Sequence, residues 1–146
     1  MGGATSQVTE VVEGYNAAVH AKDLDALIEL YDDNVRVFDA WGVWCHEGGA
    51  AWRSAARQWF ESLGIETVSV KFEDVQVIGR SSFAMLNATI TYTGFSAVDE
   101  ELRSLQNRLT WSLMQRGEAW KIVHEHTSAP VGFGDLKAIL RRDAIS

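Results

Sequence analysis

Residues 108–130 read RLTWSLMQRGEAWKIVHEHTSAP, which is the pattern of two strands joined by a tight turn. Apolar residues alternate with polar ones in and just before the first strand, so one of its faces is expected to be buried. The apolar members are Leu105, Leu109, Trp111 and Leu113. Residues 116–118, Arg-Gly-Glu, turn the chain, and a second strand follows over residues 120–127. Strands joined by so short a turn pair in the antiparallel sense.

The chain before this hairpin predicts two further strands. Residues 83–95 alternate, with Ala84, Leu86, Ala88, Ile90 and Tyr92 on one side. Residues 68–72 alternate as well, but the apolar phase then shifts to Val75 and Val77. A phase shift within a strand predicts a bulge or a sharp bend. We expect a turn at Gly79-Arg80 and a solvated acidic loop over residues 96–101.

The start of the chain is helical in pattern. Thr5 or Ser6 can cap a first helix, whose apolar residues recur at helical spacing. These residues are Val8, Val11, Val12, Tyr15, Ala18 and Val19. Asp23 can cap a second helix, which places Leu24, Leu27, Ile28 and Tyr31 on one side.

A short strand over residues 35–38 and a third helix over residues 48–63 complete the first half. An apolar stripe marks this helix, and Gly64 is its expected C-terminal cap. Asp135 can cap a short last helix. Helices that precede a run of hairpin-connected strands indicate an α+β fold, with the helices on one face of an antiparallel sheet.

Composition narrows the class of protein. The length of 146 residues suits one domain over residues 1–146. A formal net charge of −7 argues against a nucleic-acid binder, because such binding rests on phosphate neutralisation. No apolar run is long enough to cross a bilayer, and MGGATSQ at the start is not a secretory signal, so we expect no membrane partner. A single cysteine, Cys45, excludes an internal disulfide and favours a cytoplasmic location.

The hairpin sequence also carries a family resemblance. RLTWSLMQRGEA followed by WKIVHEHTSAP resembles the last two strands of the SnoaL-like branch of the nuclear transport factor 2-like superfamily. That superfamily includes ketosteroid isomerases, polyketide cyclases and the association domain of calcium/calmodulin-dependent protein kinase II. The resemblance covers nearly the whole chain. It implies a cystatin-like cone, in which N-terminal helices pack on a curved antiparallel sheet.

The N-terminal half resembles ketosteroid isomerase without a gap from Tyr15, through AKDLDALIELYDDNVRVFD, to Asp39. The resemblance implies Asp39 as the general base and Tyr15 as a donor to the oxygen that becomes charged. It also implies chemistry without a cofactor or a metal ion. The isomerase has a second donor, a protonated aspartate, on a late strand. Residues 109–112 contain no carboxyl group, so steroid isomerisation itself is not implied.

Each of these residues has a second interpretation. Trp41 and Trp44 would give Asp39 an apolar rim that raises its pKa, but a strand-end aspartate also commonly bonds to the backbone of a turn. Tyr15 either lines a pocket or packs in a core. The tryptophans Trp41 and Trp44 are expected to form part of the apolar wall of a ligand site. Arg108 would either bind a ligand carboxylate or pair with Glu125 on the next strand.

The sequence of the last strand allows two choices of which residues face inward. Strict alternation groups His124 and His126 with Trp120, whereas alignment on the isomerase directs Glu125 and Thr127 into the cavity. Glu125 and His126 are both candidate ligand contacts. The two histidines with Asp39 could imitate a metal triad. We favour a hydrogen-bonded structural pair at the sheet or at a dimer interface, and predict no metal site.

Together these features predict a domain that binds a small hydrophobic, carbonyl-containing molecule and transfers a proton on it. The alternative is a non-catalytic ligand-binding or oligomerisation module. Because helices can cover only one face of a curved sheet, we expect a second copy of the chain to cover the other. The expected partners are therefore a small hydrophobic molecule and the protein itself, as a homodimer or larger assembly.

Overall fold

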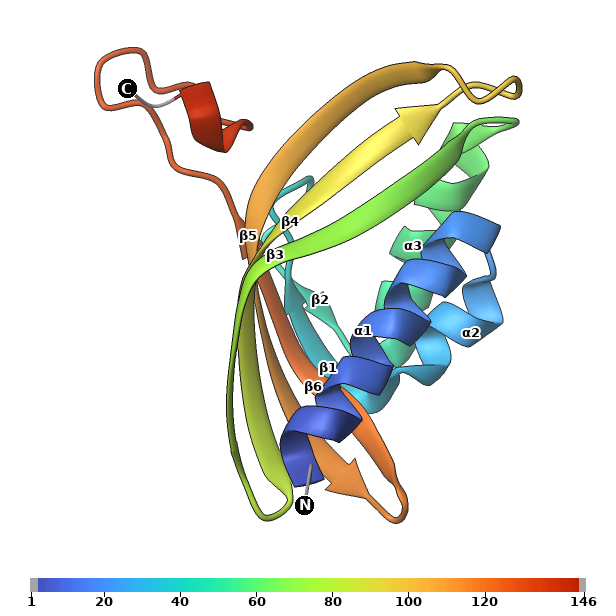
Figure 1. The fold of residues 1–146 in the computed structure, drawn as a ribbon, viewed down its shortest axis with the longest axis vertical. Helices are drawn as coiled ribbons and strands as arrows, with labels where there is room; N and C mark the ends of the chain where they lie inside the picture. The colour runs from blue at the N-terminus through green and yellow to red at the C-terminus, as the bar shows by residue number, and fades with distance from the viewer. Residues whose placement is uncertain (1–2, 145–146) are drawn as a thin grey trace.

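The computed structural model describes residues 3–144 and places three helices beside one strongly bent sheet (Figure 1). The elements, in chain order, are α1 (Gly3–Ala21), α2 (Leu24–Glu29), β1 (Tyr31–Phe38), β2 (His46–Glu47), α3 (Gly49–Leu63), β3 (Thr67–Arg80), β4 (Phe83–Phe95), β5 (Glu101–Arg116), β6 (Ala119–Ser128) and a 3₁₀ turn (Arg142–Ala144). The predicted α+β class, with N-terminal helices on a curved sheet, is confirmed. No helix within residues 3–144 is both long and apolar enough to cross a membrane.

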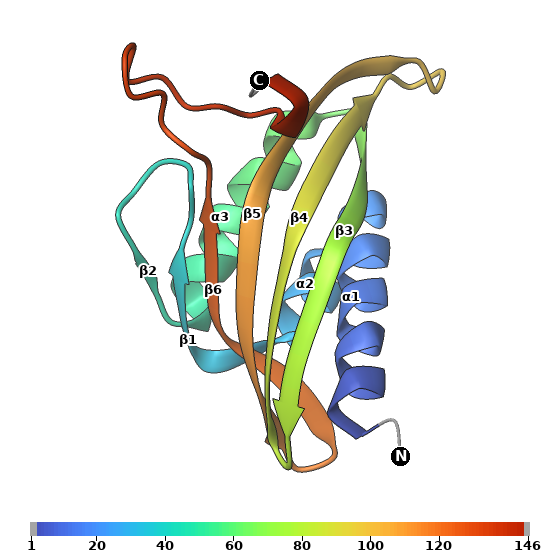
Figure 2. The ribbon, with the colours of Figure 1, turned by 60° about the vertical axis from the view of Figure 1, so that its left-hand side comes forward.

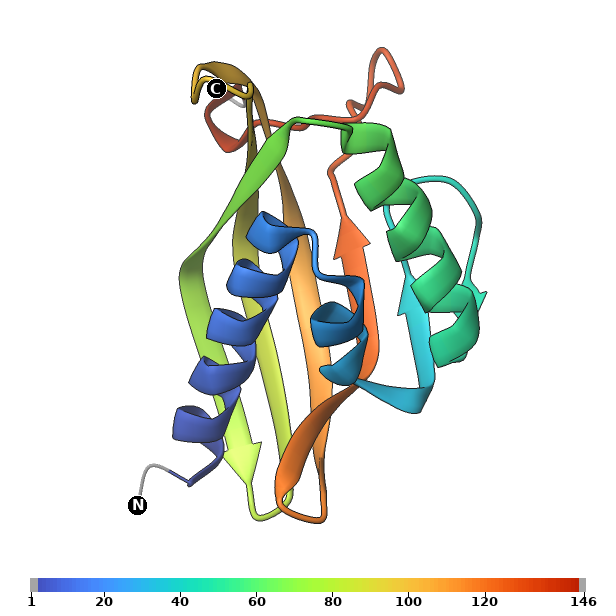
Figure 3. The same ribbon diagram turned by 90° about the vertical axis from the view of Figure 1, so that its right-hand side faces the viewer.

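The six strands form one sheet in the order β2-β1-β6-β5-β4-β3 (Figure 2). Consecutive hairpins join β3 to β6, and β1 then pairs with β6 in the parallel sense, which differs from the wholly antiparallel sheet that we predicted. All three helices lie on the same face of the sheet (Figure 3). The concave face is therefore covered by helices, and the opposite face is not.

Most of the core comes from the alternating residues that the sequence marks as apolar. Leu109, Trp111 and Leu113 on β5 are fully buried, as are Leu86 and Ile90 on β4. Trp111 packs edge-on against Tyr15 of α1, at 5.6 Å between ring centroids, because both residues lie on the faces that meet. The floor of the cone is thus an aromatic layer between α1 and the sheet.

Two bulges set which residues face this core. In β3 the pairing with β4 slips by one residue after Glu73, and Asp74 takes a left-handed conformation with φ of 53°. This confirms the bulge predicted from the phase shift. In β6 the pairing with β5 slips between Ile122 and His124, which places one extra residue, Val123, in the strand. Beyond it Glu125 and Thr127 face inward and are buried, while His126 faces outward and is exposed.

Several predicted boundaries hold and several do not. Asp23 caps α2 by accepting a hydrogen bond from the Ala26 amide, and Gly64 ends α3 with φ of 58°, as predicted. The predicted cap at Thr5 or Ser6 is wrong, because α1 starts at Gly3 and contains both. The predicted turn at Gly79-Arg80 is also wrong, because β3 continues to Arg80 and the chain turns at residues 81–82.

The C-terminal segment differs from the short helix that we predicted. Residues 133–135 form a turn, residues 136–140 contain no helix, and Val131 bridges to Ala138. The segment then returns to the sheet, where the Gln106 amide donates to the Leu140 carbonyl at 2.7 Å. Asp135 still accepts a hydrogen bond from the Lys137 amide, so it organises a turn instead of a helix.

Candidate functional site

A cavity of about 650 Å³ lies between the helices and the concave face of the sheet. That volume is within the range that small-molecule sites occupy. Its wall is largely apolar and aromatic, with contributions from α1, α3, the loop after β1, and strands β3 to β6. The aromatic residues that line it are Tyr15, Trp41, Trp52, Trp59 and Tyr92.

Asp39 lines this cavity at the point where β1 ends. The parallel register pairs Phe38 with His126, so Asp39 comes to lie beside Thr127. The Thr127 hydroxyl donates to Asp39 Oδ1 at 3.1 Å and accepts from the Ala40 amide at 2.8 Å. Burial raises the pKa of Asp39, and the hydrogen bond from Thr127 opposes part of that rise. The carboxyl group is therefore held in place and partly desolvated.

Tyr15 and Tyr92 meet inside the cavity, where their hydroxyl oxygens are 2.9 Å apart. The Tyr15 ring is wedged between Phe72 and Trp111, which fixes the position of its hydroxyl. Burial raises the pKa of both phenols, so both remain protonated at neutral pH. Only one of the two protons is used in the bond between them. The other is free to be donated to a ligand.

Glu125 is a third ionisable group on the cavity wall and is only 2% exposed. Its Oε1 accepts from the Tyr31 hydroxyl at 2.5 Å and from the Trp111 indole nitrogen at 2.9 Å. The contact with Trp111 follows from register, because the two residues are direct neighbours on β5 and β6. Desolvation raises the pKa of Glu125 to about 7, against the opposing effect of these two bonds.

Asn107 adds an unpaired polar group to the same wall. It lies on the inward face of β5, is buried, and its Oδ1 has no hydrogen-bond partner within residues 3–144. Buried side-chain amides usually have partners in native proteins. Because Oδ1 is an acceptor, it is a candidate contact for a hydrogen-bond donor of a bound molecule.

The structure brings together four of the residues predicted for the site: Asp39, Tyr15, Glu125 and Trp41 all line the cavity. The prediction that Trp44 forms part of the wall is wrong, because the residue is 94% exposed and does not line the cavity.

Arg108 and His126 were also predicted to contact ligand, and both lie on the other face of the sheet. Arg108 is exposed and donates to the Ser128 hydroxyl at 3.1 Å, so it neither enters this cavity nor pairs with Glu125. His126 is exposed because the bulge at Val123 reverses the alternation before it. The predictions for both residues are corrected on this ground.

The two histidines of the last strand do not form a cluster of metal ligands with Asp39. His124 Nδ1 lies 2.6 Å from the Arg36 carbonyl, and both imidazoles pack edge-on against Phe38 on the outer face. Across the described residues, no three His, Cys, Asp or Glu side chains come close enough together to hold a metal ion. His124 therefore makes a hydrogen bond at the sheet surface, while the prediction that both histidines form a hydrogen-bonded structural pair stays a prediction.

Several cavity residues were not predicted, among them Tyr92, Asn107, Arg103 and His46. Three of them carry a detectable signal. Arg103 and Asn107 share the alternation of Leu105 and Leu109, and Tyr92 shares that of Ile90. His46 stands between Cys45 and Glu47 in a loop, where position in the sequence gives no direction.

Residues 8–132 match the sequence profile of the SnoaL-like domain. This chain belongs to that family. The match spans most of the described fold, from α1 to the segment after β6. The extent of the domain beyond it, over all of residues 1–146, stays a prediction. A search of curated proteins gives no match.

Solved structures share the fold of this SnoaL-like protein. A nuclear transport factor 2-like protein of unknown function from Pseudomonas putida has a TM-score of 0.82 at 21% identity, covering 96% of each chain. A ketosteroid isomerase-like protein from Erwinia carotovora has a TM-score of 0.68 at 15% identity, over 88% of this chain and 97% of the other. A putative calcium/calmodulin-dependent protein kinase II association domain from Xanthomonas campestris has a TM-score of 0.69 at 16% identity, over 88% and 89%. At these identities the likeness shows the fold alone.

Proposed function

We propose that the cavity binds a small hydrophobic molecule that carries a carbonyl group, and that Asp39 removes a proton from the carbon next to that carbonyl. One observation carries the proposal: a desolvated carboxyl group and a pair of protonated phenols, Tyr15 and Tyr92, line one largely apolar cavity. An apolar wall holds the body of such a ligand, and a few polar groups orient it. One of the proteins that share the fold is itself described as ketosteroid isomerase-like.

The proton transfer needs no cofactor. The Asp39 carboxylate takes the proton, the C–H bond breaks, and its electron pair forms the enolate, whose oxygen carries the negative charge. A phenol proton of Tyr15 or Tyr92 donates a hydrogen bond to that oxygen. Where the ligand carries a carbon–carbon double bond next to the deprotonated carbon, the enolate is a dienolate, and return of the proton from Asp39 to its far carbon completes an isomerisation. Burial favours this step because it brings the pKa of Asp39 closer to neutrality.

Glu125 fits the role of a second group that contacts the ligand. Both of its hydrogen bonds end on Oε1, so Oε2 has no partner among the described residues. With a pKa of about 7, a large share of Glu125 is protonated at neutral pH and can donate from that oxygen. In this proposal Tyr31 and Trp111 position Glu125, while Glu125 itself contacts the ligand.

The proposal is tested with the wild-type protein and a panel of cyclic ketones. Tryptophan fluorescence reports binding, since Trp41, Trp52 and Trp59 line the cavity. Exchange of α-protons for deuterium, followed by NMR, reports proton transfer without knowledge of the natural substrate. We expect exchange in at least one ketone that binds. Binding without exchange in any of them would leave the alternative, a non-catalytic ligand-binding module, and would overturn the enzymatic proposal.

We also propose that the protein is a homodimer or a larger assembly that uses the uncovered face of the sheet. Helices cover only the concave face, and the other face presents half-buried Met85, Met114 and Ser112 beside exposed His126. The association domain-like neighbour supports an assembling role for this fold. Sedimentation equilibrium at micromolar concentration is expected to give at least twice the monomer mass of 16.2 kDa. Detection of the monomer alone would contradict this prediction.

A further inference from the structure

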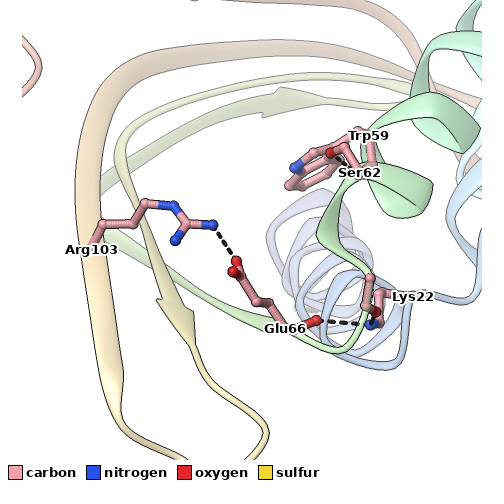
Figure 4. Close-up of polar contacts among 6 residues, drawn as sticks. Lys22, Trp59, Ser62, Glu66 and Arg103 are labelled. Atoms are coloured by element: carbon pink, nitrogen blue, oxygen red, sulfur yellow. Dashed lines mark hydrogen bonds and ion pairs between the residues drawn. The ribbon is translucent and has the colours of Figure 1, made fainter.

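Arg103 is a charged residue on the inward face of β5, where the cavity opens. It follows the alternation that directs Leu105, Asn107 and Leu109 inward, and it lines the cavity. Figure 4 shows its side chain reaching from β5 across the opening toward Glu66, with Trp59 and Ser62 of α3 nearby. The guanidinium therefore lies at the mouth of an otherwise largely apolar pocket.

The fold makes room for this arginine. Gly94 is paired with Arg103 on the neighbouring strand and is buried. A Cβ atom on Gly94 would lie 3.6 Å from Arg103 Cζ and 3.7 Å from its Cγ, so the arginine lies flat over the glycine. These are ordinary van der Waals distances, so an alanine at position 94 would also fit, whereas a longer side chain would meet the arginine. Gly94 therefore packs under the Arg103 side chain, which is itself exposed in its ion pair with Glu66.

Glu66 occupies only part of the donor capacity of Arg103. Nη2 of Arg103 donates to Glu66 Oε1, whereas a guanidinium has five N–H donors. Lys22 fixes the backbone on which Glu66 stands, since its ammonium donates to the carbonyls of Gly64 at 2.6 Å and Glu66 at 2.8 Å (Figure 4). The other N–H donors of Arg103 have no partner among the described residues, so they remain available to a ligand at the mouth of the cavity.

We propose that the ligand of this cavity is a carboxylic acid, whose carboxylate binds Arg103 at the mouth while its apolar body enters the cone. This inference rests on the proposed function and adds the class of ligand. A planar carboxylate matches the fork of an arginine, and charge-assisted hydrogen bonds are stronger than neutral ones. Among the described residues that line the cavity, Arg103 is the only arginine or lysine.

The register of the sheet indicates how long a ligand must be to reach from Arg103 to Asp39. Leu109 pairs with Thr127, which bonds to Asp39, so the level of the base lies six residues along β5 from Arg103. That is roughly 20 Å of extended strand, and the bend of the sheet shortens the direct path. Asn107, with its unpaired amide, stands between the two levels. An elongated acid with a carbonyl away from its carboxylate can therefore reach both ends.

The test uses a matched pair of compounds, naphthoylpropionic acid and its methyl ester. Both carry an apolar ring and a ketone, and only the acid carries a charge. Two methylene groups separate the ketone from the carboxyl carbon, so the pair tests binding at Arg103 and not proton transfer at Asp39. We expect wild-type protein to bind the acid more tightly than the ester, and Arg103→Met to lower acid affinity roughly tenfold without changing ester affinity. Glu66→Gln should raise acid affinity several-fold, because it removes the competing carboxylate. Arg116→Met is the control, since Arg116 pairs with Asp32 at the other end of β5.

The outcomes separate this inference from the function on which it rests. If acid and ester bind equally, and neither Arg103→Met nor Glu66→Gln changes their ratio, the acid-binding role of Arg103 is overturned while the hydrophobic pocket stands. If neither compound binds wild-type protein, both proposals fail. Should Arg103→Met fold poorly, Glu66→Gln alone decides the matter, because an unchanged acid affinity in that variant also overturns the inference.

Discussion

Asp39→Asn is expected to lower the rate of α-proton exchange by roughly 10²–10⁴-fold, the usual range for loss of a general base. The substitution keeps the shape of the side chain, and an amide oxygen can still accept the hydrogen bond from Thr127. It removes the basic oxygen that takes the proton. The measurement is deuterium exchange into a bound ketone, compared between wild type and variant at the same occupancy.

The same variant should bind the ketone as wild type does, because the aromatic wall supplies most of the contact area. Asp25→Asn is the matched control: Asp25 is exposed on α2 and pairs with Arg53 away from the base. It should change neither binding nor exchange. If Asp39→Asn exchanges as fast as wild type, another group is the base, and Glu125 is the next candidate on this wall.

The sequence predicts elements well wherever a local pattern sets them. The ends of β4, the cap at Asp23 and the stop at Gly64 all follow from residues within a few positions of each boundary. The start of the first helix was predicted less precisely, because Thr5 and Ser6 are good caps but are also tolerated inside a helix. Local chemistry offers both choices there, and only packing selects between them.

The inward face of β6 could not be predicted, because it depends on a single extra residue. Strict alternation from Trp120 directs His124 and His126 inward, and the bulge at Val123 reverses this for Glu125 and Thr127. Whether a bulge forms depends on the partner strand, here the pairing of Trp111 with Glu125 and the hydrogen bond between them. That contact joins residues whose meeting no local pattern encodes.

Site residues were predicted where the family resemblance covers them. They were missed where the position of a residue along the cone decides whether it lies in the core or lines the cavity. Asp39 and Tyr15 came from the resemblance, and both line the cavity. Arg103 and Asn107 share one face with Trp111, yet Trp111 is sealed beneath α1 while Arg103 stands at the opening. An inward residue belongs to the core where a helix covers it and to the cavity where none does. The alternation of apolar residues does not predict how far each helix extends over a strand.

Glu125→Gln is expected to flatten the pH dependence of stability. The pKa of Glu125 rises from 4.5 to about 7 on folding, chiefly because burial disfavours the charged carboxylate. Between these pH values the native state keeps a proton that the unfolded state has lost. The free energy of unfolding of wild type therefore falls as pH rises through this window, by about 3 kcal/mol in total. Below pH 4.5 both states are protonated, and this contribution to stability is fully present.

Glutamine is neutral at every pH in this range, and its amide oxygen can accept from both Tyr31 and Trp111. Stability of Glu125→Gln relative to wild type should therefore rise with pH and level off above about pH 7. Asp39, whose pKa is also raised, contributes in the same direction to both proteins, and its charge adds to the rise in the pKa of Glu125. Urea denaturation across this pH range measures that difference. Glu118→Gln, in the exposed turn before β6, is the control and should follow wild type throughout. Parallel curves for wild type and Glu125→Gln would show that Glu125 does not hold a proton in the native state near neutrality, and its role as a donor to the ligand would fail with it.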